Sequence, residues 1–368
     1  MVSSTTSSGS SFGSYRLFEQ LGVGGMATVH RAEHQDRPGE SLALKRLRPE
    51  LAAIPEFVQA FVDEARLASY LHHPNVAQTY DFGKVDETYF LAMELVRGPT
   101  LSQLLRERSR IPLPVSLYLI VQLCDALEYA HNLCDAEGNP LGIIHRDVTP
   151  ANIIVSTAGI AKLIDFGIAK AASSSVRTKT GFIKGKFAYV APEYIAGKID
   201  TRVDLFAAGV IAHELLTGRR LFQVENDMET LKRVQRMPIE PPSKWNPKVP
   251  PALDEIVMTS LARNPDERWQ RASAMRNAFV FIAQRLPTQQ QVARWLADVP
   301  VPEPSAATSG VSIEIQLIEE TMVTNARRPG FAEHLITART RATQQRLWVI
   351  VVVLSLVLLG LLAYLFTH

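Results

Sequence analysis

Residues 145–152 read His-Arg-Asp-Val-Thr-Pro-Ala-Asn, and residues 165–167 read Asp-Phe-Gly. We expect Asp147 and Asn152 to share one loop, with Asp165 on the short hairpin that follows. A carboxylate can accept the proton of a hydroxyl group, whereas amide and carboxylate oxygens are the hard ligands that Mg²⁺ prefers. The pattern therefore predicts a catalytic base, Asp147, beside two metal ligands, Asn152 and Asp165.

Any one of these three residues alone could be a turn or cap residue, because Asp and Asn are common at both. Their joint order and spacing make that alternative a poor one for all three. The two stretches resemble the catalytic loop and the metal-binding loop of the bacterial eukaryotic-like (Hanks-type) serine/threonine protein kinases. The resemblance runs from about Tyr15 to Leu286.

The resemblance implies an α+β fold with the two lobes of the protein kinases. Short segments rich in Val, Leu and Tyr come first, which predicts a small β-rich lobe with one helix. After Gly98 the apolar residues recur at helical spacing, which predicts a larger helical lobe. The expected strands span residues 27–33, 41–47, 77–82 and 89–95, and the expected helices span residues 55–71, 114–132, 200–217, 251–262 and 272–285.

The activity that the resemblance implies is transfer of the γ-phosphoryl group of Mg·ATP to Ser and Thr hydroxyls of cytoplasmic proteins. ATP and Mg²⁺ are the expected cofactors. A competing hypothesis is a membrane-anchored pseudokinase, a scaffold that binds nucleotide and recruits partners. The retained Lys45, Asp147 and Asp165 argue against a pseudokinase, whereas Ala27 and Thr149 depart from the family pattern and argue for it.

A glycine-rich turn lies near the start of the β-rich part. Small residues let the backbone approach phosphate oxygens, and unpaired N–H groups can donate to them. Such turns are common, so the turn alone is weak support for nucleotide binding. The resemblance assigns ATP binding to Leu21, Gly22, Val23, Gly24, Gly25, Met26, Ala27, Thr28 and Val29. Ala27 replaces the usual third glycine, and we expect a modest effect on nucleotide binding.

Lys45 ends an apolar strand, where a lysine could simply extend to water. The resemblance makes it the lysine that contacts the α- and β-phosphates, oriented by Glu64 on the helix of the small lobe. Asp63 is the rival partner, but one step around a helix turns a side chain by about 100°, so only one acid can face Lys45. Met93 and Glu94 resemble the residue that guards the adenine pocket and the first hinge residue.

The segment from Asp165 to Glu193 resembles a kinase activation segment. In the family, an arginine placed as Arg146 is beside the base and needs an anionic partner, usually a phosphorylated residue of this segment. Thr178 and Thr180 are the expected sites, although hydroxyls in such loops are often only solvated. Phosphorylation of one copy by another would require a dimer, which the resemblance also suggests.

Two departures from the family occur together. Thr149 stands where serine/threonine kinases usually carry a lysine, and Lys186 stands where they usually carry a threonine. The two positions adjoin in the kinase fold, so we predict that Lys186 is a catalytic cation that replaces the missing lysine. The same swap could instead alter the choice of substrate or weaken the activity.

Several other residues have expected structural roles. The resemblance predicts a salt bridge between Glu193 and Arg268, and a brace between Asp204 and the backbone of the catalytic loop. The adjacent residues His72 and His73 suggest a metal site at first sight, but no third ligand is nearby in the sequence. We expect a structural role for both histidines.

The bulk composition excludes some classes of function. A net charge of +2 gives no reason to expect a nucleic-acid partner. The two cysteines, Cys124 and Cys134, fall in a segment that we expect to be one helix, which would separate them by about 15 Å. That distance is too large for a disulfide, so we expect free buried thiols, as in a reducing cytosol.

The two ends of the chain differ from its centre. Residues 1–14 predict a disordered Ser/Thr-rich leader, residues 15–286 the kinase domain, and residues 287–346 a Pro-rich, Arg-containing linker. Residues 347–366 form a run of 20 residues without a charge, long enough to cross a hydrocarbon core about 30 Å thick. A buried core helix is the alternative, but such helices usually carry a polar stripe. Five arginines between positions 327 and 346 predict a single-pass anchor in the cell membrane with the kinase domain in the cytoplasm.

Overall fold

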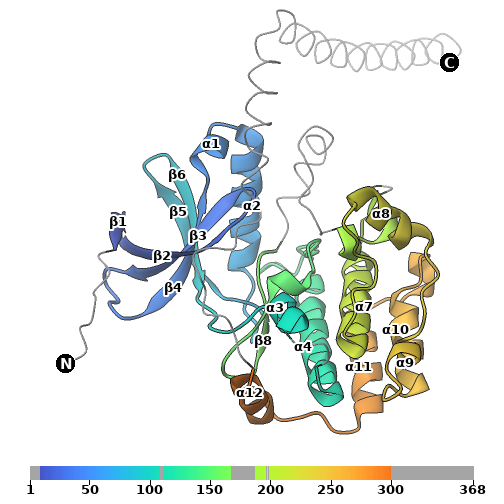
Figure 1. The fold of residues 1–368 in the computed structure, drawn as a ribbon. Helices are drawn as coiled ribbons and strands as arrows, with labels where there is room; N and C mark the ends of the chain where they lie inside the picture. The colour runs from blue at the N-terminus through green and yellow to red at the C-terminus, as the bar shows by residue number, and fades with distance from the viewer. Residues whose placement is uncertain (1–8, 108–110, 167–186, 196, 198, 300–368) are drawn as a thin grey trace, which may run out of the picture. The chain divides into compact units, whose positions relative to one another are not determined.

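The computed structural model describes residues 9–107, 111–166, 187–195, 197 and 199–299. These residues form a β-rich lobe and a helical lobe, joined through the segment that follows Glu94 (Figure 1). The two-lobed protein-kinase fold predicted from the sequence is therefore present.

The small lobe is built on one antiparallel sheet of six strands. Its spatial order is β1-β2-β3-β4-β6-β5, so the long connection between β4 and β5 leaves the sheet and returns to its edge. The strands are β1 (Ser10–Phe12), β2 (Tyr15–Val23), β3 (Ala27–His34), β4 (Ser41–Leu47), β5 (Thr79–Val85) and β6 (Thr88–Glu94). The four strands predicted from the sequence are confirmed with shifts of a few residues at their ends.

Helix α2 (Pro55–Ser69) covers one face of this sheet and follows the short helix α1 (Pro49–Ala52). Its residues Phe61 and Ala65 are buried in one apolar cluster with Ala43 and Leu47 of β4. Alternate residues of a strand point to the same face, so Lys45, between Ala43 and Leu47 in the same register, also faces α2. The strand and the helix together therefore direct the lysine toward the interior of the lobe.

The large lobe is a bundle of helices with one short hairpin. Its elements are α3 (Leu101–Glu107), α4 (Leu113–His131), β7 (Ile153–Val155), β8 (Ala161–Leu163), α6 (Pro192–Ile195), α7 (Arg202–Thr217), α8 (Asp227–Arg236), α9 (Pro242–Trp245), α10 (Pro251–Ser260), α11 (Ala272–Ala283) and α12 (Gln289–Ala297). Helix α7 is buried from Val203 to Thr217. At Gly209 a β-carbon would lie only 2.6 Å from the Cβ of Ser260, so the glycine lets α7 and α10 pack closely.

Three expectations need correction. Residues 10–12 were expected in a disordered leader, yet they form β1, which pairs with β2 and buries Phe12. Residues 289–297 were expected in a linker, yet they form α12, which joins the core of the large lobe. Cys134 was expected in the same helix as Cys124, but α4 ends at His131 and Cys134 is exposed, whereas Cys124 is buried.

Helix α4 is the one described helix that is long and apolar enough to cross a membrane. It is mostly buried inside the large lobe, where it packs against α7 and α11, as expected of a core helix. The predicted span at residues 347–366 lies outside the described residues.

Candidate active site

Lys45 lies at the centre of the cleft between the lobes and bonds to an acid from each side. Its Nζ is 2.7 Å from Oε1 of Glu64 on α2 and 3.0 Å from Oδ1 of Asp165, which follows β8 in the large lobe. Asp63, the rival partner, is instead bonded to Gln59 on the exposed side of α2. The helix therefore turns Glu64, not Asp63, toward the lysine, because Glu64 shares the buried face of Phe61 and Ala65.

The two carboxylates fix the charge of the lysine. Burial alone would lower the pKa of Lys45, but Asp165 and Glu64 outweigh it and hold the pKa above its ordinary value. Lys45 therefore carries a permanent positive charge inside the cleft. A buried ammonium held in one position is suited to orient the oxygens of a polyphosphate.

The catalytic loop brings Asp147 and Asn152 into direct contact. The side-chain amide of Asn152 donates to the backbone carbonyl of Asp147 at 2.8 Å and to its Oδ2 at 3.1 Å. A 3₁₀ turn at Pro150–Asn152 folds the chain back so that this contact forms. Neither bond uses the side-chain oxygen of Asn152, which is therefore available as a metal ligand.

The two predicted metal ligands lie at the open end of one hairpin. Asn152 directly precedes β7 and Asp165 closely follows β8, and the Ile164 N–H donates to the Asn152 carbonyl at 2.9 Å. Asp165 has a positive φ of 53°, a conformation that costs energy for any residue except glycine and gathers at functional sites. One amide oxygen and one carboxylate suit Mg²⁺, which usually keeps several waters.

Asp204 at the start of α7 holds the catalytic loop in place. Its carboxylate accepts from the backbone N–H of His145 at 2.8 Å and of Arg146 at 2.9 Å, and it is 2.9 Å from Nε2 of His131. Although burial acts to raise the pKa of Asp204, the bonds from His131 and the loop hold it below its ordinary value. The predicted brace is therefore present, and His131 is a partner that the sequence did not reveal.

The two predicted hinge residues, Met93 and Glu94, have side chains held within the protein. Met93 is buried, and the side chain of Glu94 is held by Lys162 at 2.8 Å and by the Gln78 N–H at 3.2 Å. The Glu94 side chain is therefore engaged within the protein.

The glycine-rich turn joins β2 to β3. Gly24 donates its N–H to the carbonyl of Ala27 at 2.8 Å, which closes the turn, and a β-carbon at Gly22 would meet no atom within 4 Å. Ala27 is buried in the same apolar cluster as Leu47 and Phe61. Its methyl group therefore contributes to the core of the lobe, which agrees with a modest effect on nucleotide binding.

A cavity opens beside the base, between the catalytic loop and residues 187–194. It is lined in part by Asp147, Thr149, Tyr189 and Tyr194. The hydroxyl of Thr149 is buried and has no hydrogen-bond partner among the described residues. Lys186, the proposed replacement for a lysine at position 149, lies outside the described residues.

The environment of the Arg146 side chain favours binding of an anion. It adopts a positive φ of 63°, and its Nε is buried without a hydrogen-bond partner in the part of the chain that the structure describes. An unpaired guanidinium nitrogen away from water is costly, and a phosphate group nearby would satisfy it. The expected phosphorylation sites, Thr178 and Thr180, lie outside the described residues.

Two ion pairs, one buried and one between buried Glu214 and exposed Arg220, lie in the large lobe. The predicted salt bridge is present: both terminal nitrogens of Arg268 bond to Glu193, at 2.5 and 2.6 Å. Sequence reasoning missed the second pair, in which Glu214 of α7 bonds to Tyr189 and Arg220, both at 2.8 Å. No local motif marks this pair, because it joins three separate segments.

The adjacent histidines have structural contacts. His73 stacks on the ring of Tyr129 with centroids 5.0 Å apart, and His72 bonds to Gln78. The described residues contain no group of three or more His, Cys, Asp or Glu side chains that could hold a metal ion by themselves. A structural role for both histidines agrees with these contacts.

Comparisons with known proteins place this site in a family. The pattern of the protein kinase domain matches residues 15–280. Tyrosine-protein kinase MasK of Myxococcus xanthus is 38% identical over 283 residues, which cover 75% of this chain but only 44% of MasK. Serine/threonine-protein kinase PknA of Mycobacterium tuberculosis is 31% identical over 347 residues, which cover 91% of this chain and 77% of PknA.

The fold is also similar to solved structures. The crystal structure of the PknI kinase domain of Mycobacterium tuberculosis superposes with a TM-score of 0.59 at 28% sequence identity. The match covers 76% of this chain and 99% of that domain. The chain therefore belongs to the protein kinase family, and its kinase domain is of the bacterial eukaryotic-like serine/threonine type.

Proposed function

We propose that the protein transfers the γ-phosphoryl group of Mg·ATP to Ser and Thr hydroxyls of other proteins. The observation that carries this proposal is the pair of bonds from Lys45 to Glu64 and to Asp165. These bonds align the small lobe with the metal-binding loop, which is the arrangement that phosphoryl transfer in protein kinases requires.

Each residue of the cleft has a separate task in this proposal. Asp147 orients the acceptor hydroxyl and accepts its proton. Lys45 orients the α- and β-phosphates, and Asn152 and Asp165 hold Mg²⁺, which neutralises charge that develops on the transferred group when the nucleotide is bound. The chain contributes position and charge, and the hydroxyl oxygen of the acceptor forms the new bond to phosphorus.

The pseudokinase alternative has no support in the geometry. A scaffold that only binds nucleotide has no need of a base, yet Asp147 lies at the contact with Asn152 that a working catalytic loop would use. Ala27, one of the two departures that kept the alternative open, packs into the core of the small lobe.

Activation by phosphorylation follows from the environment of Arg146. We propose that phosphate on Thr178 or Thr180 satisfies its buried Nε. One copy would modify another, so the active form would pass through a dimer.

The acceptor residue is a separate question, since one relative is named a tyrosine-protein kinase. A second candidate function is transfer to tyrosine, favoured by Thr149, which is smaller than the lysine expected beside the base and lines the cavity there. Phosphoamino-acid analysis of a phosphorylated acceptor protein separates the two functions. We expect phosphoserine and phosphothreonine, and a product that is only phosphotyrosine would reject the Ser/Thr proposal.

Replacing Lys45 by Ala is expected to lower the rate of transfer strongly without unfolding the protein. The change removes the cation that orients the phosphates, and it leaves Glu64 and Asp165 facing each other, so the KM for Mg·ATP should rise. Steady-state transfer to casein measures the effect. Lys84, an exposed lysine on β5, gives the matched control as Lys84→Ala, which should retain parental kinetics. Parental kinetics in Lys45→Ala would reject the assigned role.

Residues 347–366 are proposed as a membrane anchor that keeps the kinase domain in the cytoplasm, on the strength of their length and their lack of charge. The alignment with PknA covers 91% of this chain, so it extends past the kinase domain into the region between that domain and the anchor.

Deletion of residues 347–368 is expected to release the protein into the soluble fraction with its kinase activity retained. The physical reason is that the deletion removes the longest uncharged run of the sequence and none of the residues around Lys45 and Asp147. Fractionation of cells, followed by an activity assay on both fractions, measures the outcome. A protein that stays with membranes after a high-salt wash would require a different anchor.

A further inference from the structure

Helix α12 begins after the last residue that matches the kinase domain pattern, yet it is part of the large lobe. Val292 and Leu296 of this helix, and Val299 after it, are buried in the main apolar cluster of the lobe. A capping box between Thr288 and Gln291 fixes the start of the helix. The helix lies beside β8 and apart from α11, to which residues 284–288 join it (Figure 1).

The contact surface of α12 is the turn between β7 and β8. Gly159 in this turn has a φ of +81°, which favours glycine, and a β-carbon there would lie 2.3 Å from the carbonyl oxygen of Gln289 and 2.8 Å from the nitrogen of Ala293. Only glycine at this position lets the first turn of α12 lie directly against the turn of the hairpin.

The same hairpin is also bonded to the hinge. The Thr157 N–H donates to the Arg97 carbonyl at 2.8 Å, and the Val155 N–H donates to the Pro99 carbonyl at 2.9 Å. At Gly98 a β-carbon would lie 2.1 Å from the carbonyl oxygen of Val155. The hairpin and its turn therefore contact both the hinge and α12.

The far end of this hairpin carries the two predicted metal ligands. Each strand of the hairpin has three residues, so its two ends are only about 10 Å apart. Asn152 and Asp165 flank the hairpin and are tied together by the bond from Ile164 to Asn152. A displacement of the turn is therefore transmitted to the metal ligands and to the hinge together.

We propose that α12 is a positioning element of the nucleotide site: by pressing the β7–β8 turn against the hinge, it sets the positions of Asn152 and Asp165. The proposal rests on the proposed function in taking Mg·ATP as the ligand. Residues that hold metal-binding side chains in place commonly control the affinity for the metal. A metal-binding side chain that is free to move must be fixed when the metal binds, and this lowers the binding free energy.

The first test separates contact with α12 from strain in the backbone. Gly159→Ala places a methyl group against Gln289, whereas Gly138→Ala imposes the same left-handed strain at φ +85° where a β-carbon would meet nothing within 4 Å. Calorimetric titration of the full chain with Mg·ATP measures binding without turnover. We expect the Kd to rise about 10-fold in Gly159→Ala, as for other supporting residues of metal sites, and to stay unchanged in Gly138→Ala.

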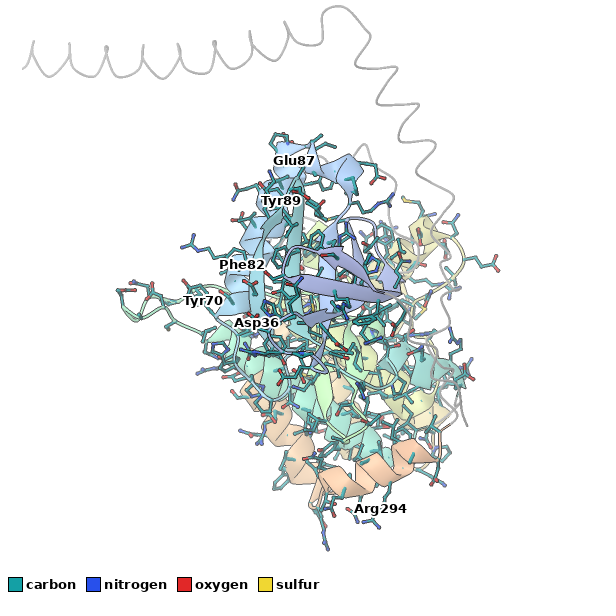
Figure 2. The ribbon with its side chains drawn as sticks, turned by 90° about the vertical axis from the view of Figure 1, so that its left-hand side faces the viewer. Asp36, Tyr70, Phe82, Glu87, Tyr89 and Arg294 are labelled. Atoms are coloured by element: carbon teal, nitrogen blue, oxygen red, sulfur yellow. The ribbon has the colours of Figure 1, made fainter. Side chains whose placement is uncertain are left out.

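The second test reaches the same contact from the helix. Leu296→Ser removes a buried anchor of α12, Leu296→Met conserves its volume, and Arg294→Ser alters the exposed side of the helix, where Arg294 points away from the fold (Figure 2). We expect a similar rise in Kd for Leu296→Ser alone, together with faster hydrogen exchange at the Ile164 N–H. Leu296→Met and Arg294→Ser should bind as the parent does.

A raised Kd in both Gly159→Ala and Leu296→Ser, with parental controls, supports the proposal. A Leu296→Ser variant that melts at a lower temperature but binds Mg·ATP as the parent does would overturn it, because α12 would then only stabilise the lobe. An effect in Gly159→Ala alone would also overturn it, since the turn would act without the helix. A parent protein that binds no Mg·ATP would reject the proposed function, and with it the proposed role of α12.

Discussion

Asp147→Asn is expected to abolish phosphoryl transfer while Mg·ATP still binds nearly as tightly as to the parent. An amide keeps the shape of the side chain and an oxygen that can accept from Asn152, but it cannot take up the proton of the acceptor hydroxyl. Loss of a general base typically lowers the rate by about 10²–10⁴. Lys45, Asn152 and Asp165 are untouched, so the contacts to phosphates and metal should survive.

Single-turnover transfer and calorimetric binding of Mg·ATP together measure this separation of chemistry from binding. Asp63→Asn is the matched control, because Asp63 is an acid on the outer side of α2 that contacts neither Lys45 nor the catalytic loop. Full turnover in Asp147→Asn would show that Asp147 is not the base. Equal losses in both variants would point to a general effect of charge.

Lys186→Thr is expected to lower kcat by about 10²–10³, with a smaller effect on affinity for ATP, as for removal of a donor that stabilises charge in the transition state. The expectation comes from the reciprocal exchange of Thr149 and Lys186 relative to the family. The structure adds one observation: Thr149 is buried in the loop of Asp147, and its hydroxyl has no hydrogen-bond partner among the described residues.

Adding Thr149→Lys to the Lys186→Thr variant should restore much of the rate, because the cation returns from the opposite side of the site. The double-mutant cycle should therefore be strongly non-additive. If Lys186→Thr alone is as active as the parent, the exchange is a coincidence and Lys186 serves substrate recognition or faces solvent.

The candidate site residues of the large lobe were accessible from the sequence because they are close together along the chain. One loop and one hairpin connect Asp147, Asn152 and Asp165. Their spacing along the sequence therefore predicts that the three side chains lie close together. Strand β4 was predicted with its observed ends for the same reason, since its apolar pattern is local. The choice of Glu64 over Asp63 needed the structure, although the buried series Ala60, Phe61, Glu64 and Ala65 has helical spacing that favours Glu64.

The parts that the sequence did not predict depend on contacts between distant segments. Helix α12 begins with three glutamines beside a proline-rich stretch, so its start resembles a polar linker, and its contact with the Gly159 turn joins segments far apart in the sequence. Strand β1 is mostly serine, and only the burial of Phe12 against the sheet distinguishes it from a disordered leader. The pair of Glu214 with Arg220 and Tyr189 likewise exists only once the segments have met.

Autophosphorylation of the purified full chain with Mg·ATP, followed by mapping of the modified residues by mass spectrometry, tests the account most directly. The account predicts phosphate on Thr178 or Thr180, where it can satisfy the buried Nε of Arg146, and no phosphate in the Asp147→Asn variant. A parent protein that binds Mg·ATP but gains no phosphate on itself or on casein would contradict the account and favour a nucleotide-binding scaffold.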